Sequence, residues 1–129
     1  MLENHGQCYW VTGLSGAGKT SVCRQLLKSM KEINPNIVLL DGDDLRKVLN
    51  TQAFNREERL KIAFTYARLA KLLTSQGTNV VFAVMALFSE VHKWNRENIK
   101  CYTEVFLDVP IEELIRRDTK GLYEKYNSG

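Results

Sequence analysis

The stretch that decides the fold is Gly13-Leu14-Ser15-Gly16-Ala17-Gly18-Lys19-Thr20, which matches the G-x-x-x-x-G-K-S/T pattern of a phosphate-binding loop. The glycines allow positive φ, so the backbone can curl around phosphate oxygens where side chains would collide. Backbone N–H groups of the loop, and of the helix that it opens, point positive partial charge at phosphates. The pattern therefore predicts a nucleotide site in which Lys19 reaches the β- and γ-phosphates and the Thr20 hydroxyl binds Mg²⁺.

The sequence around the loop has the strand-then-helix order that such a loop requires. A short β-prone run from Gln7 to Thr12 leads into it, and the residues from Ala17 to Lys31 read as a helix. Farther along, apolar runs bounded by turn residues predict strands at 37–40, 79–85 and 103–109. The stretches between and after them predict helices at 44–50, 56–76 and 89–99, and a last one that begins at Pro110.

This alternation predicts an α/β fold of three layers, in which helices cover both faces of a parallel sheet. The run at 37–40 is apolar on both faces, as a strand covered on both sides should be. In the long helix at 56–76, with Gly77 as its C-cap, we expect one apolar stripe toward the sheet. Its members are Leu60, Ala63, Phe64, Ala67, Ala70 and Leu73. A length of 129 residues suits a single domain, 1–129.

Composition narrows the classes of function. With 44% hydrophobic and 26% charged residues, the chain has the make-up of a globular domain rather than a disordered one. Its longest apolar run, 80–88, is about half of the ~18 residues that a membrane span needs, and no leader-like segment opens the chain. The scattered Cys8, Cys23 and Cys101 favour a reducing cytoplasm over disulfides or a zinc site. A net charge of +3 gives no reason to expect a nucleic-acid partner.

A second motif, Asp41-Gly42-Asp43-Asp44-Leu45-Arg46, follows the strand at 37–40. Ligands bind beyond the carboxyl ends of parallel strands, so we expect these acids beside the phosphate loop. Asp43 could position an acceptor hydroxyl, and Asp41 could hold Mg²⁺ through water. The alternative is that Asp43 or Asp44 only caps the helix at 44–50. Arg46 lies one turn beyond Asp43, and its guanidinium suits bidentate recognition of phosphate or sulfate.

Together with a later run, Arg117-Asp118-x-Lys120-Gly121-Leu122-Tyr123, these two motifs resemble those of the adenylylsulfate (APS) kinases, and the resemblance covers nearly the whole chain. Enzymes of that family transfer the γ-phosphate of ATP to the 3′-hydroxyl of APS, giving PAPS and ADP. The resemblance implies a P-loop kinase fold, ATP and Mg²⁺ as cofactors, a small nucleotide as substrate, a cytoplasmic location and a homodimer. It also implies a fifth strand, which we expect beyond Gly129 in a longer chain.

The resemblance further implies roles for single residues. Lys19 and Asp43 would be catalytic, with Asp43 orienting or deprotonating the acceptor hydroxyl, and Thr20 and Asp41 would hold Mg²⁺. The ring of Phe54 would stack on the acceptor base. The residues that bind the acceptor would be Asp41, Asp43, Arg46, Phe54, Arg56 and Arg59. Those that bind ATP would be Gly13, Leu14, Ser15, Gly16, Ala17, Gly18, Lys19 and Thr20, with Arg117 and Lys120 on a lid.

The departures from the family pattern gather on the acceptor side. Arg59 stands where the family has an asparagine that helps to bind APS, and Ala86 stands where it has a serine. The stretch at 90–98 replaces an arginine-rich one, and its Trp94 either walls the acceptor pocket or packs as part of the core. In these features the chain resembles an APS kinase-like sub-branch from bacterial polysaccharide gene clusters, for which cytidine diphosphoramidate is an alternative acceptor.

Two other classes of function are considered. A GTPase switch is disfavoured because the sequence has no Asn-Lys-x-Asp guanine motif. A non-catalytic ATP-binding module would use residues 13–20 but would have no need of a carboxylate aimed at an acceptor, so Asp43 favours a kinase. A nucleoside monophosphate or gluconate-type kinase would share the loop but not the run from Lys120 to Tyr123.

Overall fold

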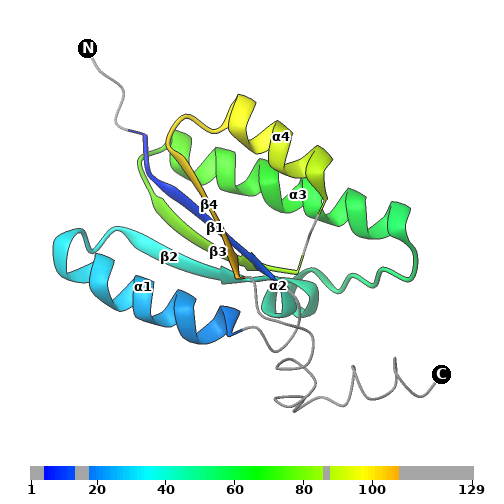
Figure 1. Ribbon diagram of the computed structural model, residues 1–129, viewed down its shortest axis with the longest axis horizontal. Helices are drawn as coiled ribbons and strands as arrows, with labels where there is room; N and C mark the ends of the chain where they lie inside the picture. The colour runs from blue at the N-terminus through cyan, green and yellow to red at the C-terminus, as the bar shows by residue number, and fades with distance from the viewer. Residues whose placement is uncertain (1–4, 14–17, 86–87, 108–129) are drawn as a thin grey trace.

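A parallel sheet forms the middle layer of the molecule (Figure 1). The computed structural model describes residues 5–13, 18–85 and 88–107, and within these residues the sheet has four strands. They are β1 (Cys8–Gly13), β2 (Ile37–Asp41), β3 (Asn79–Val84) and β4 (Tyr102–Leu107). Their order across the sheet is β2-β3-β1-β4, and every neighbouring pair is parallel. The predicted parallel α/β fold is therefore confirmed.

The two central strands are the most deeply buried parts of the chain. All six residues of β3 are buried, and so are all residues of β1 except Tyr9. Trp10 pairs in register with Phe82, and their ring centroids lie 5.1 Å apart. Continuous apolar strands of this kind are expected where helices cover both faces of a sheet.

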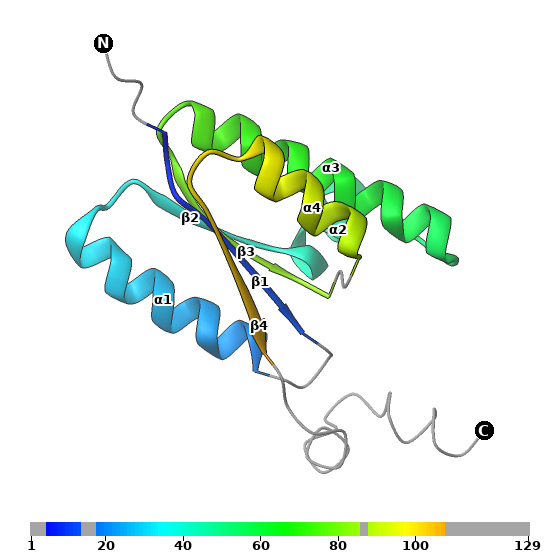
Figure 2. The ribbon, with the colours of Figure 1, turned by 45° about the horizontal axis from the view of Figure 1, so that its top comes forward.

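Helices cover the two faces of the sheet unequally (Figures 1 and 2). One face packs against α1 (Lys19–Ile33), where Val11, Cys23 and Val81 belong to a small core. The opposite face packs against α3 (Arg56–Ser75) and α4 (Ser89–Asn98), over a larger core around Trp10 and Phe82. The expected boundaries of strands and helices hold to within two residues wherever the structure describes them. The short helix α2, for example, begins at Gly42, two residues earlier than expected.

The buried stripe of α3 differs from the predicted one. Ala63, Ala67 and Ala70 are buried as expected, but Tyr66 and Thr74 are buried with them. The expected members Leu60, Phe64 and Leu73 are only partly buried and pack around the edge of the core. The small alanines let α3 lie close to the sheet, so that the ring of Tyr66 stacks on Phe82 with centroids 5.5 Å apart. The helix ends in a Schellman arrangement at Gly77, where the N–H groups of residues 77 and 78 bond to the carbonyls of residues 74 and 73.

The two tryptophans lie in the core or at its edge, which decides between the two alternatives given for Trp94. Trp10 is fully buried in the core. Trp94 is partly buried, and its ring meets Phe64 of α3 edge-on at 6.5 Å. Trp94 therefore packs between helices rather than against the acceptor side.

In the described part of the chain, no helix is long and apolar enough to cross a membrane.

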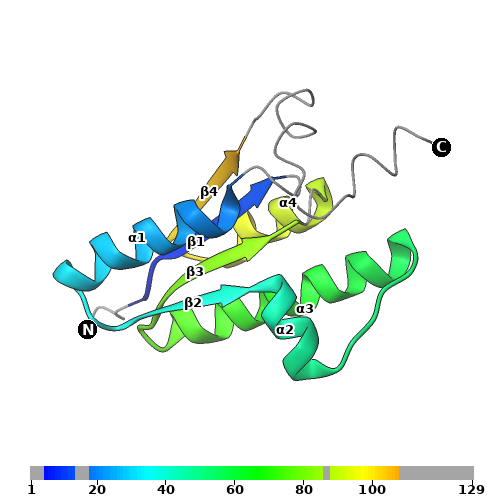
Figure 3. The ribbon, with the colours of Figure 1, turned by 90° about the horizontal axis from the view of Figure 1, so that it is seen from below.

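Because all strands run the same way, their carboxyl ends meet at one edge of the sheet (Figure 3). The segment after β1 leads to α1 at this edge, and β2 continues there directly into α2 (Gly42–Leu49). The first turns of α3 and α4 lie on the same side of the molecule (Figure 3). Ligands of open parallel sheets bind beyond such an edge, so the candidate site is sought here.

At the opposite edge, Gly6 makes a close backbone contact that holds the start of β1. Its N–H donates to the carbonyl of Thr74 at 2.7 Å. A Cβ atom at this position would lie 1.9 Å from the carbonyl oxygen of Thr78. Only glycine lets the chain pass the turn between α3 and β3 at this distance.

We predict that Gly6→Ala lowers the free energy of unfolding by roughly 2 kcal/mol, because the backbone must move to admit the methyl group. Urea unfolding followed by circular dichroism would measure the change. Gly42→Ala is the matched control, since an added Cβ there would meet nothing nearer than 3.4 Å. Equal stability of the two variants would contradict the role given to Gly6.

Candidate active site

The first turn of α1 is suited to bind an anion. Gly18 is its N-cap, with φ of 93°, a left-handed backbone that L-residues with side chains rarely adopt. No side chain caps this helix, and its first turn holds no acidic residue. The other three helices of the described residues each carry an acid in the first turn, and α2 and α3 also have a side-chain cap. Among these helices α1 is therefore the one whose positive end is left for a ligand.

Lys19 stands at the base of the phosphate loop. Its Nζ donates to the carbonyl oxygen of Gly13 at 2.9 Å, so the side chain spans from the first residue of α1 to the last residue of β1. The ammonium group therefore lies between the end of β1 and the start of α1. Of the predicted ATP-binding residues, Leu14, Ser15, Gly16, Ala17, Arg117 and Lys120 lie outside the described residues.

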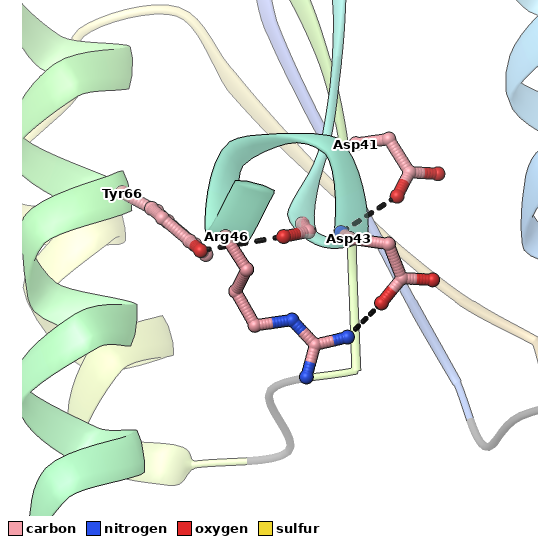
Figure 4. Close-up of polar contacts among 5 residues, drawn as sticks. Asp41, Asp43, Arg46 and Tyr66 are labelled. Atoms are coloured by element: carbon pink, nitrogen blue, oxygen red, sulfur yellow. Dashed lines mark hydrogen bonds and ion pairs between the residues drawn. The ribbon is translucent and has the colours of Figure 1, made fainter. Parts of the chain in front are cut away.

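Asp41 is the N-cap of α2. Its Oδ1 accepts a hydrogen bond from the backbone N–H of Asp43 at 2.8 Å (Figure 4). The alternative reading of the sequence, in which Asp43 or Asp44 caps this helix, is therefore wrong. The helix begins at Gly42 because the extended backbone of Asp41 places its carboxylate over the first N–H groups.

Asp43 and Arg46 form an ion pair on the exposed side of α2 (Figure 4). The two side chains are three residues apart on the helix, and each is about half exposed. Arg46 lies one turn beyond Asp43, as expected, and its guanidinium reaches back to contact the Asp43 carboxylate. Asp44 is exposed in the same first turn.

Tyr66 is a further residue of this site, and the sequence analysis did not identify it. Its hydroxyl donates to the carbonyl oxygen of Gly42 at 3.4 Å, which ties α3 to the start of α2 (Figure 4). Burial raises the pKa of Tyr66, Arg46 lowers it, and Asp43 and Asp41 raise it further. The signal in the sequence was its position, three residues after Ala63 and four before Ala70 on the stripe of α3.

Cys23 links the two motifs electrostatically. The residue is fully buried in the core between α1 and the sheet. Burial raises its pKa to about 11, the charge of Asp41 raises it as well, and that of Lys19 lowers it. The charges at the end of β2 and at the start of α1 thus have opposite effects on the pKa of one thiol.

The segment before α3 presents Phe54 to solvent. The ring is 79% exposed, as a residue that stacks on a ligand base must be in the free protein. Its backbone N–H donates to Glu58 Oε2 at 2.7 Å, and the N–H of Glu58 donates to the side chain of the N-cap Asn55 at 2.8 Å. This reciprocal capping fixes the position of Phe54 relative to the helix. Arg59, one residue farther along α3, is exposed.

Arg56 connects the first turns of α3 and α4. Its Nη2 donates to Glu90 Oε2 at 2.7 Å, and its guanidinium carbon lies 5.1 Å from the centre of the Phe88 ring. Arg56 therefore faces α4 at the carboxyl edge of the sheet, whereas Asp43 and Arg46 lie on α2. The predicted acceptor residues thus belong to two groups on the same side of the molecule. Ala86 lies outside the described residues.

The oxygen donors near the loop fit Mg²⁺. In the described residues, no three side chains of His, Cys, Asp or Glu gather in a metal-binding cluster. Kinase sites need no such cage, because Mg²⁺ there takes one or two protein oxygens and completes its shell with phosphates and water. Thr20 is exposed in the first turn of α1, and Asp41 ends β2 at the carboxyl edge of the sheet. These two residues offer one hydroxyl and one carboxylate, a donor set that suits the ion.

Comparison with known proteins agrees with this geometry. The sequence profile of the family described as adenylylsulphate kinase matches residues 5–129. The chain is 38% identical to the cytidine diphosphoramidate kinase of Campylobacter jejuni, over 96% of this chain and 73% of that protein. It is 41% identical to the adenylyl-sulfate kinase of Pseudomonas aeruginosa, over 93% of this chain and 63% of that protein. The chain thus spans between three fifths and three quarters of the length of these relatives.

A solved structure is similar in both sequence and fold. The Mycobacterium tuberculosis APS kinase CysC, determined in complex with AMPPNP and APS, superposes with a TM-score of 0.79 at 34% identity. The match covers 97% of this chain and 75% of that one. The phosphate loop, the parallel sheet and the family profile all lead to one conclusion: the chain belongs to the adenylylsulphate kinase family of P-loop kinases.

Proposed function

We propose that this protein transfers the γ-phosphate of ATP to a ribose hydroxyl of an acceptor nucleotide whose 5′-phosphate carries a second acidic group. The observation that carries the proposal is the Asp43–Arg46 ion pair, which stands on α2 at the same edge of the sheet as the first turn of α1. A module that only binds ATP would need the α1 end alone. A carboxylate held in place beside it gives the acceptor hydroxyl a partner.

Most of the catalysis would consist of positioning and charge neutralisation, because phosphoryl transfer asks for little covalent chemistry from the protein. The N–H groups of the first turn of α1 and the Lys19 ammonium would bind the phosphates of ATP. Asp43 would accept the proton of the attacking hydroxyl, held in orientation by Arg46. Thr20 and Asp41 would hold Mg²⁺, which supplies positive charge to the transferring group. Arg117 and Lys120 would close over the phosphates.

On the acceptor side, Phe54 would stack on the base, and Arg56, with Arg59, would bind the anionic end. The first candidate acceptor is APS, phosphorylated at its 3′-hydroxyl to give PAPS and ADP. The second is cytidine diphosphoramidate. It is favoured by the likeness to the Campylobacter jejuni kinase and by Arg59, which stands in place of the family's asparagine.

We predict that Lys19→Ala and Asp43→Ala both abolish turnover, but for different reasons. Loss of the lysine should lower kcat by about 10²–10³-fold and weaken ATP binding, because a charge on the phosphates is lost. Loss of the aspartate should lower kcat by about 10²–10⁴-fold and leave the Kd for ATP almost unchanged. ADP release would measure turnover, and calorimetry with a non-hydrolysable ATP analogue would measure binding.

Asp44→Ala is the matched control, since Asp44 is an exposed acid in the same turn of α2. It should retain the activity of the unmodified protein. The assay uses APS, cytidine diphosphoramidate, plain nucleotides and no acceptor, in this chain and in one extended at the carboxyl end. Equal loss of ATP affinity in Lys19→Ala and Asp43→Ala would refute the role of Asp43. ATP binding without turnover of any acceptor, in both chains, would favour the binding module.

A pair of substitutions at Asp41 separates its structural role from its proposed role in metal binding. Asp41→Asn keeps an oxygen that can cap α2, so unfolding should be almost unaffected, whereas Asp41→Ala should cost about 1 kcal/mol. Both should raise the Mg²⁺ concentration needed for half-maximal turnover, because both remove the negative charge. Full activity of Asp41→Asn at low Mg²⁺ would show that Asp41 is a cap and nothing more.

A further inference from the structure

Glu90 is the one acidic side chain in the first turn of α4, and it lies in contact with a proposed acceptor-binding residue. Its Oε2 accepts the hydrogen bond from Arg56 at 2.7 Å, while Oε1 is 3.4 Å from the hydroxyl of Ser89. Arg56 also covers the ring of Phe88, so its guanidinium is held between a carboxylate and an aromatic face. An anion and a cation thus lie side by side where the first turns of α3 and α4 meet, and both helices begin on the side of the carboxyl edge of the sheet (Figure 3).

The pair contributes little to the stability of the fold. The Arg56 side chain is 65% exposed and that of Glu90 is 44% exposed. Exposed ion pairs are worth little to folding, because water screens them and both side chains lose freedom. The hydrogen bond from Arg56 lowers the pKa of Glu90, so the carboxylate is charged at neutral pH. An exposed carboxylate beside an arginine that is proposed to bind anions is better explained by an effect on a bound ligand than by an effect on the stability of the fold.

The two groups differ in the hydrogen bonds that they can make. A guanidinium only donates, and an ionised carboxylate only accepts. A terminal sulfate carries acceptor oxygens and negative charge, so Arg56 would attract it and Glu90 would repel it. A terminal phosphoramidate has acceptor oxygens and an –NH₂ group as well, so its oxygens could face Arg56 while its N–H faces Glu90. The Arg56–Glu90 pair is therefore complementary to a terminal phosphoramidate, whereas only its arginine is complementary to a terminal sulfate.

We propose that Glu90 is a specificity-determining residue, which accepts a hydrogen bond from the amide N–H of an acceptor nucleotide that ends in a phosphoramidate and disfavours one that ends in a sulfate. The inference rests on the proposed function, since it concerns the acceptor end of the same site. In this proposal, the contact between Arg56 of α3 and Glu90 of α4 selects the chemical class of the acceptor nucleotide. The phosphate loop and the Asp43–Arg46 pair take no part in that selection.

The test compares Glu90→Gln with Glu97→Gln. Glutamine has the shape of glutamate and can still accept from Arg56, but it lacks the charge. Glu97 is an exposed acid on the same helix, paired with Lys93 at 4.0 Å, and serves as the matched control. For each protein we would measure kcat/KM with cytidine diphosphoramidate and with APS, the KM for ATP, and the Kd of each acceptor by calorimetry with a non-hydrolysable ATP analogue.

The unmodified protein should prefer the phosphoramidate. In Glu90→Gln, the ratio of kcat/KM for phosphoramidate to that for APS should fall about tenfold, through the KM of the acceptor nucleotide, because the N–H of the phosphoramidate then donates to a neutral oxygen and the sulfate is no longer repelled. The KM for ATP should not change, and Glu97→Gln should keep the original ratio. An unchanged ratio in Glu90→Gln, or a preference of the unmodified protein for APS, would overturn the role of Glu90 and leave the proposed kinase activity standing. If the unmodified protein neither bound nor phosphorylated either acceptor, the proposed function would fail, and the role of Glu90 with it.

Discussion

The parallel direction of all four described strands is the constraint on which the rest of the site depends. It brings the carboxyl ends of β1, β2 and β3 to one edge, although the segments that follow them are far apart in the sequence. The strand order places β3 between β1 and β2, so β3 separates the end of β1, which leads to Lys19 at the start of α1, from Asp41 at the end of β2. An antiparallel arrangement would send one of these groups to the opposite edge. The sheet therefore assembles the site before any side chain contributes.

The helices that begin at this edge differ in what neutralises their amino ends. The amino ends of α2 and α3 are neutralised by the caps Asp41 and Asn55 and by acids in their first turns. The amino end of α1 has neither, because Gly18 supplies a turn and no side chain. The amino end of α1 is therefore better suited to an anion than those of α2 and α3, since no capping side chain or acid offsets its macrodipole. Lys19 adds a full charge at the same place, from which it reaches the end of β1.

The features that could be predicted from the sequence are those set by local pattern. The apolar runs located the four strands, and the phosphate-loop motif located the start of α1, because both depend on neighbours in the chain. The one-turn spacing of Asp43 and Arg46 could be seen in the sequence for the same reason, whereas their ion pair was not foreseen. The alternative in which Asp43 or Asp44 caps α2 was wrong, because the sequence does not say which aspartate has extended backbone. Tyr66 and the pairing of Arg56 with Glu90 were not found, since each joins elements that only tertiary packing brings together.

The contrast between local patterns and tertiary contacts explains why family membership supports ATP as the phosphate donor more firmly than it supports any one acceptor nucleotide. The ATP side is built from a contiguous loop and a helix start, so a short motif carries it from one relative to the next. The acceptor side, as proposed, involves α2, the segment before α3, and the first turns of α3 and α4. One substitution on any of these elements alters the contacts of another, as Glu90 on α4 alters the charge around Arg56 on α3. Relatives of similar identity can therefore differ in acceptor, and those named here include both an adenylyl-sulfate kinase and a cytidine diphosphoramidate kinase. The identity of the acceptor must be sought in such contacts between elements.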